Sequence, residues 1–153
     1  FESATHSAGV LAMSKSPKVK EEHVKSIRSY GHHFGMAYQL IDDLLDYVGS
    51  KTIMGKNTGD DLSEGKLTLP IILALAKTTG REKNSLLHAL KQKSSANLEE
   101  IVEIITSSGA IEDTRKAAFH EIEQAREHLL HLPENEYRKA LESLTEYSAD
   151  RIF

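Results

Sequence analysis

Between Val24 and Val48, apolar or small residues recur at steps that alternate strictly between three and four positions. The set comprises Val24, Ile27, Gly31, Phe34, Tyr38, Ile41, Leu45 and Val48. Such a seam is typical of a helix that packs along other helices. Gly31 and Gly35 would let a second helix approach closely. We therefore predict one long helix that starts at Ser16-Pro17, a good N-cap pair, and ends at about Val48.

The remaining sequence also predicts helices, and only three prolines and nine glycines interrupt 153 residues. Further helices are expected over residues 1–13, 71–76, 81–93, 97–107, 110–132 and 134–153. A loop rich in glycine and charge is expected over residues 49–66. The predicted fold class is all-α, a helical bundle in a single domain over residues 1–153.

Charge, cysteine content and hydropathy exclude several classes of function. A net charge of -4 provides no basic field, so we expect no nucleic-acid partner. The absence of cysteine excludes disulfides, thiolate catalysis and Cys-ligated metal, and fits a cytoplasmic protein. No apolar run approaches the ~20 residues that cross a bilayer. The chain starts at Phe1, inside helix-like sequence without a capping residue, so we expect it to be part of a longer chain.

An acidic cluster lies in an otherwise apolar part of the long helix. At helical spacing, Gln39, Asp42, Asp43 and Asp46 share one face, within an arc of about 100°. The rest of the circumference is apolar, which predicts a buried helix. Buried carboxylates without nearby Lys or Arg need a cation, and Mg²⁺ shared with substrate phosphates fits an all-oxygen cluster. The alternative is an exposed acidic stripe that binds nothing.

The loop over residues 49–66 supplies complementary charge. Lys56 and Lys66 can act as point charges on a diphosphate, and the loop glycines permit close approach of the backbone to phosphate. Asp60 and Asp61 add oxygens that could reach a metal. A loop of this length is more often functional than a mere connection. The alternative is a solvated polar loop.

Eight histidines raise the question of a transition-metal site. His32 and His33 are adjacent and point to different helix faces, and His128 and His131 share a face that reads as a solvated surface. No H-E-x-x-H motif is present. We therefore do not expect zinc.

Two segments carry a family resemblance: G-M-A-Y-Q-L-I-D-D-L-L-D-Y at 35–47 and G-K-N-T-G-D-D-L-S-E-G-K-L-T-L-P at 55–70. Together they resemble the second aspartate-rich region of trans-type polyprenyl diphosphate synthases, and most closely the bacterial octaprenyl diphosphate synthase-like members that make quinone side chains. The resemblance covers the whole chain but only the C-terminal half of the family. It implies the corresponding half of an isoprenoid-synthase-type fold.

The resemblance implies a Mg²⁺-dependent prenyltransferase that adds isopentenyl diphosphate to an allylic diphosphate by ionisation and condensation. Such enzymes are homodimers in their full-length form. By similarity, Asp42, Asp43 and Asp46 would be catalytic metal ligands, assisted by Asp61. The predicted diphosphate contacts are Lys56, which is also catalytic, Lys66 and Gln39.

The sequence departs from the family pattern because the first aspartate-rich motif and the upstream arginines are missing. We therefore expect the 153 residues to be inactive alone. One alternative is a non-catalytic helical partner or regulatory subunit of a prenyl synthase. Another is a terpene cyclase, which is disfavoured because cyclases typically lack the G-K-x-T-L-P type of loop.

Overall fold

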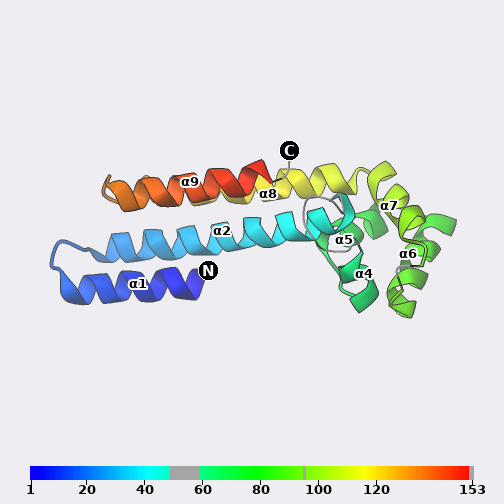
Figure 1. The fold of residues 1–153 in the computed structure, drawn as a ribbon, viewed down its shortest axis with the longest axis horizontal. Coiled ribbons are helices and arrows are strands. Elements are labelled where there is room, and N and C mark those ends of the chain that lie inside the picture. Colours follow the sequence, from blue (N-terminus) through cyan, green and yellow to red (C-terminus); the bar gives the residue numbers. More distant parts are fainter. Residues whose placement is uncertain (49–58, 95, 152–153) are drawn as a thin grey trace. The chain divides into compact units, whose positions relative to one another are not determined.

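The computed structural model describes residues 1–48, 59–94 and 96–151, and every regular element in these ranges is an α-helix (Figure 1). The helices are α1 (Glu2–Lys15), α2 (Glu21–Val48), α4 (Asp60–Glu64), α5 (Leu69–Lys77), α6 (Gly80–Gln92), α7 (Leu98–Ser107), α8 (Ala110–Leu129) and α9 (Glu136–Asp150). The all-α prediction is confirmed. None of the helices described here is both long and apolar enough to cross a membrane.

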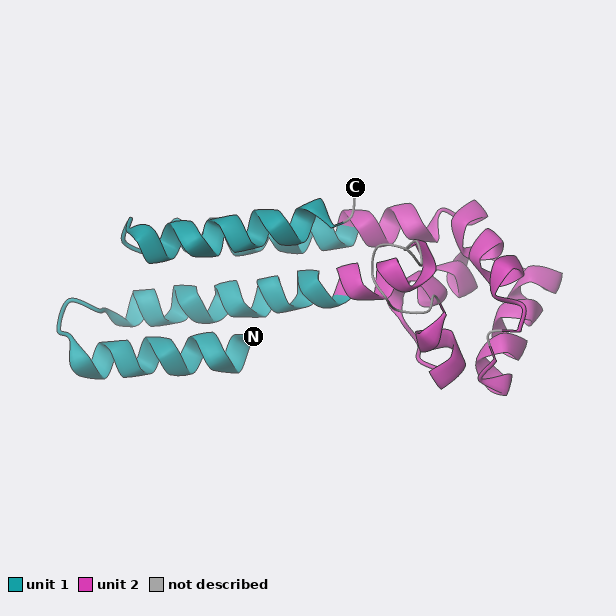
Figure 2. Ribbon diagram, viewed as in Figure 1, with its two compact units in different colours: residues 1–39, 117–153 teal, residues 40–116 magenta. Residues whose placement is uncertain are grey.

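The chain forms two compact units (Figure 2). Unit 1 contains residues 1–39 and 117–153, and unit 2 contains residues 40–116. Both α2 and α8 contribute to both units, because the division falls within these two helices. The prediction of one domain over residues 1–153 stays a prediction.

The core of unit 1 is aromatic and aliphatic. Tyr30 and Phe34 of α2 pack with Ala125 and Leu129 of α8, and Leu141 of α9 covers the cluster. The two aromatic rings stack with centroids 5.6 Å apart. The buried Tyr30 hydroxyl donates to the Leu141 carbonyl at 3.4 Å, so its polar end is satisfied within the core.

Helix α1 packs on the glycine positions of α2. A Cβ placed on Gly31 would lie 2.0 Å from Oγ1 of Thr5, and one on Gly35 would lie 3.2 Å from Cβ of Phe1. The Phe1 ring meets the Phe34 ring edge-on at 5.0 Å. The prediction that these two glycines admit a second helix is therefore confirmed.

The predicted start of the long helix at Ser16-Pro17 is wrong. Ser16 instead ends α1, donating its main-chain N–H to the Ala12 carbonyl at 3.0 Å. A turn follows, in which the N–H of Val19 bonds the Ser16 carbonyl at 3.1 Å. Helix α2 begins only at Glu21, where two glutamates in the first turn suit the positive end of the helix dipole.

Unit 2 is built around buried aliphatic side chains, and the last turns of α2 contribute Ile41 and Leu44. Helix α5 adds Ile71, helix α6 adds Leu86 and helix α7 adds Ile105, each with an exposed fraction of 0%. Pro70 in the first turn starts α5 immediately after Thr68. The C-terminal end of α2 therefore contributes to the buried core of unit 2.

Candidate active site

The acidic stretch of α2 is less buried than its sequence predicts. Asp43 is buried, with 8% of its surface exposed, whereas Asp42 and Asp46 are half-buried and Gln39 is exposed. The prediction of a helix buried on all sides is wrong, because Met36, which lies before the cluster on the same helix, is 45% exposed. Only the side that carries Ile41, Leu44 and Tyr47 is fully packed. Apolar composition alone does not indicate which faces of α2 pack against other parts of the protein.

Asp46 binds the segment that follows the glycine-rich loop. Its Oδ1 accepts the main-chain N–H of Asp60 at 3.2 Å, and its Oδ2 accepts that of Asp61 at 3.1 Å. The N–H of Gly59 donates to the main-chain carbonyl of Asp46 at 3.0 Å. Three hydrogen bonds therefore join residue 46 to residues 59–61.

These bonds explain a helix that the sequence analysis missed, since residues 60–64 were expected to be loop and form α4. The residue before this helix is Gly59, which has no side chain to cap it and adopts a left-handed φ of 86°. Asp46 supplies the cap from a distant point in the chain. Burial raises the pKa of the Asp46 carboxyl above its ordinary value, and the bond from the Asp61 N–H partly opposes this.

Lys66 is held by carboxylates of the same segment. Its Nζ lies 2.7 Å from Oε2 of Glu64 and 2.9 Å from Oδ1 of Asp61. Both carboxylates raise the pKa of Lys66 above its ordinary value, and the hydrogen bond to Glu64 has the largest effect. The main-chain N–H of Lys66 also donates to the Asp61 carbonyl at 2.9 Å. Three predicted site residues, Asp46, Asp61 and Lys66, are thus joined in one series of contacts.

Tyr47 and Thr68 form a buried pair that sequence reasoning did not single out. Their hydroxyl oxygens lie 3.3 Å apart, and both residues are less than a tenth exposed. Burial raises the pKa of Tyr47 to about 12, and the carboxylates of Asp46, Asp61 and Asp43 add to the shift. The only sequence signal for this pair is a tyrosine directly after the acidic motif and a threonine directly before Leu69-Pro70.

Two further substrate contacts were predicted, Lys56 and Gln39. Lys56 lies outside the described residues, so its predicted role in catalysis and diphosphate binding stays a prediction. Gln39 belongs to unit 1 and the three aspartates to unit 2. Its predicted contact with the substrate stays a prediction as well.

The chemistry of the donors fits a hard divalent cation, because the candidates are all carboxylates. Within the part of the chain that the structure describes, however, no three His, Asp or Glu side chains are grouped so that they could hold a metal ion. This chain therefore offers carboxylates suited to Mg²⁺ without forming a three-residue metal centre from its described residues.

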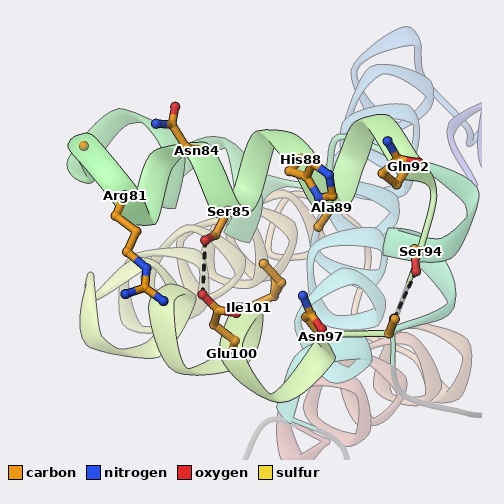
Figure 3. Close-up of a pocket in the computed structure, with 12 residues that line it drawn as sticks. Arg81, Asn84, Ser85, His88, Ala89, Gln92, Ser94, Asn97, Glu100 and Ile101 are labelled. Atoms are coloured by element: carbon orange, nitrogen blue, oxygen red, sulfur yellow. Dashed lines mark hydrogen bonds between the residues drawn. The ribbon is translucent and has the colours of Figure 1, made fainter.

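A groove of about 1130 Å³ lies between α6 and α7 (Figure 3). Most of the residues that line it have polar side chains, and Ser85 donates to Glu100 across it at 3.1 Å. None of the described residues predicted for catalysis, metal or substrate lines it. The acidic helix, and not this groove, remains the candidate site.

Comparison with known proteins gives matches over the whole chain. The model of the polyprenyl synthetase family matches residues 1–106. The all-trans-nonaprenyl-diphosphate synthase of Rhodobacter capsulatus is 41% identical over 152 residues, which cover 99% of this chain and 45% of that protein. The octaprenyl diphosphate synthase of Escherichia coli is 37% identical over 152 residues, covering 99% of this chain and 46% of that protein.

Solved structures agree with this relationship. A decaprenyl diphosphate synthase from Rhodobacter capsulatus superposes with a TM-score of 0.87 at 35% identity, covering 100% of this chain and 46% of that one. A polyprenyl synthase from Caulobacter crescentus, complexed with calcium and isoprenyl diphosphate, gives a TM-score of 0.79 at 36% identity. The match covers 89% of this chain and 42% of that one. The isoprenoid-synthase-type fold is confirmed. The chain spans somewhat less than half the length of these relatives, and it belongs to the polyprenyl synthetase family.

Proposed function

We propose that this chain is part of a trans-polyprenyl diphosphate synthase, which lengthens an allylic diphosphate with isopentenyl diphosphate for quinone side-chain synthesis. The observation that carries the proposal is the series of contacts from Asp46 through Asp61 to Lys66. It unites the acidic helix with a cationic side chain within a family to which a nonaprenyl- and an octaprenyl-diphosphate synthase are similar over this chain. The Caulobacter relative bound to calcium and isoprenyl diphosphate supports this class of ligand.

Asp42 and Asp43 are the proposed carboxylates for Mg²⁺, with the remaining ligands supplied from outside the described residues. When bound, the ion stabilises negative charge on the departing diphosphate. Lys66 supplies a point charge for the same diphosphate, and Lys56 is proposed to act with it. Gln39 is proposed to contact the substrate from the same helix. The apolar residues beside the aspartates exclude water from the allylic cation.

The proposal requires the rest of the protein, because the chain spans only 45% of its Rhodobacter relative. We therefore expect the 153 residues alone to show no turnover. For the intact enzyme we propose a cytoplasmic location and a homodimeric state. Sedimentation equilibrium tests the homodimer.

The decisive experiment incubates the intact enzyme with labelled isopentenyl diphosphate, an allylic diphosphate and Mg²⁺, and then separates the products by chain length. Mg²⁺-dependent incorporation into products longer than the primer is expected. Failure to incorporate label, with a folded enzyme, would favour a non-catalytic partner of a synthase instead. Incorporation by the 153-residue chain alone would contradict the expectation that it is inactive by itself.

A further inference from the structure

The last turn of α2 is bound to the segment 59–68 at both ends of that segment. Asp46 binds the main-chain N–H groups at its start, at 3.2 Å to Asp60 and 3.1 Å to Asp61. Tyr47 binds the Thr68 hydroxyl at its end, at 3.3 Å. Two consecutive residues of α2 therefore fix the segment that carries Lys66.

We infer that Asp46 is a positioning residue that places Lys66 through Asp61. The sequence had suggested a metal ligand at this position. The inference rests on the proposed function, in that Lys66 is taken to receive the diphosphate. Both carboxylate oxygens of Asp46 accept main-chain N–H groups of α4, so Asp46 holds the start of that helix in place.

The second step runs from Asp61 to Lys66. The N–H of Asp61 is held by Asp46, while its own Oδ1 lies 2.9 Å from Nζ of Lys66 and its carbonyl accepts the Lys66 N–H at 2.9 Å. Lys66 is thus fixed through both its main chain and its ammonium group. Because its side chain is 56% exposed, the ammonium group can still meet a ligand from solvent. A shift of Asp61 would therefore move Lys66 with it.

This role depends on hydrogen-bond acceptance, whereas a metal ligand depends on negative charge. Asn has nearly the shape of Asp and keeps one acceptor oxygen, but it carries no charge. Asp46→Asn should therefore retain part of the function, and Asp46→Ala should lose it. Asp42, the proposed ligand, provides the matched control on the same helix, because Asp42→Asn and Asp42→Ala should be equally damaging.

The test uses the intact enzyme and two measurements. Amide hydrogen exchange, followed by mass spectrometry in peptides that span Asp60 and Asp61, should accelerate roughly tenfold or more in Asp46→Ala and stay unchanged in Asp42→Ala. In steady-state assays, Asp46→Ala should lose about a hundredfold in kcat/KM, mainly through a higher KM for the allylic diphosphate. Asp46→Asn should stay within about tenfold of the wild type.

A double variant keeps the test informative should Asp46→Ala fail to fold. In a Lys66→Met background, Asp46→Asn should cause little further loss, because the residue through which Asp46 acts is already gone. Equal losses for Asp46→Asn and Asp46→Ala, or full additivity with Lys66→Met, would overturn the inference. If the wild-type enzyme extends no allylic diphosphate, the proposed function fails. Amide exchange at Asp60 and Asp61 still tests separately whether Asp46 holds these two residues.

Discussion

The imidazole rings of His33 and His128 stack, with centroids 5.3 Å apart and planes inclined by 14°. Oε2 of Glu121 lies 2.8 Å from Nδ1 of His33, and His131 follows with its ring centroid 6.4 Å from that of His128. Burial lowers the pKa of His128 below its ordinary value of 6.5, and the charge of His33 lowers it further, against an opposing effect of Glu127. The stack therefore favours a neutral His128.

The first prediction is that unit 1 loses stability on mild acidification. A pKa that is lower in the folded state than in the unfolded state means that the unfolded chain binds the proton more readily. The stabilisation is fully present above pH 6.5 and is lost as the pH falls through the lower folded-state pKa. Thermal unfolding followed by circular dichroism should give a lower Tm at about pH 5.5 than at about pH 7.5.

Two substitutions on α8 separate this effect from general acid sensitivity. His128→Gln removes the titrating ring and should reduce the fall in Tm between the two pH values. His120→Gln, at an exposed position of the same helix, should leave that fall unchanged. The same pH dependence in His128→Gln and the wild type would mean that the stack does not control it.

The second prediction concerns the contact between α1 and α2. Gly31→Ala should lower the free energy of unfolding by about 1–2 kcal/mol, because overpacking outweighs the gain in helix propensity. The added Cβ would lie 2.0 Å from Oγ1 of Thr5, 2.9 Å from its Cγ2 and 3.0 Å from its Cβ, and rotation of the Thr5 side chain leaves the contact with Cβ in place. Chemical denaturation of the two proteins measures the difference.

Gly35→Ala is the matched control in the same helix. Its Cβ would meet Phe1 at 3.2 Å, and Phe1, which is 59% exposed, can move by a few tenths of an ångström. Gly35→Ala should therefore be neutral or slightly stabilising. A larger loss at Gly35 than at Gly31 would show that the contact with Thr5 is not what limits the packing of α1 on α2.

The sequence predicted the features that depend on local pattern. The three-four seam predicted α2 to Val48, and Gly31 was correctly expected to admit another helix. Contacts between distant residues were missed. Helix α4 depends on a cap from Asp46, fourteen positions before Asp60, and the His33–His128 stack depends on packing between α2 and α8. No periodicity in either segment encodes these partners.

The third prediction concerns Asp42 in the intact enzyme. Asp42→Ala should lower turnover roughly a hundredfold to a thousandfold, because a carboxylate that stabilises charge formed in the reaction acts mainly on the transition state. The residue is half-buried, so the fold and Tm should change little. Glu103→Ala, at an exposed acidic position on α7, should leave turnover unchanged. Near-normal rates in Asp42→Ala would refute the proposed role.

The fourth prediction concerns the buried hydroxyl pair, whose oxygens lie 3.3 Å apart. Tyr47→Phe and Thr68→Val should each lower the free energy of unfolding by about 0.5–1.5 kcal/mol, since each leaves the other hydroxyl buried without this partner. Thr68 stands at the N-cap of α5 but its side chain makes no capping bond there, so Thr68→Val removes the contact with Tyr47 and no cap. The double variant should cost less than the sum of the two, because a single hydrogen bond is lost in each case. Strict additivity in urea denaturation would mean that the two hydroxyls do not interact, and that α2 is held to the Lys66 segment by Asp46 without help from Tyr47.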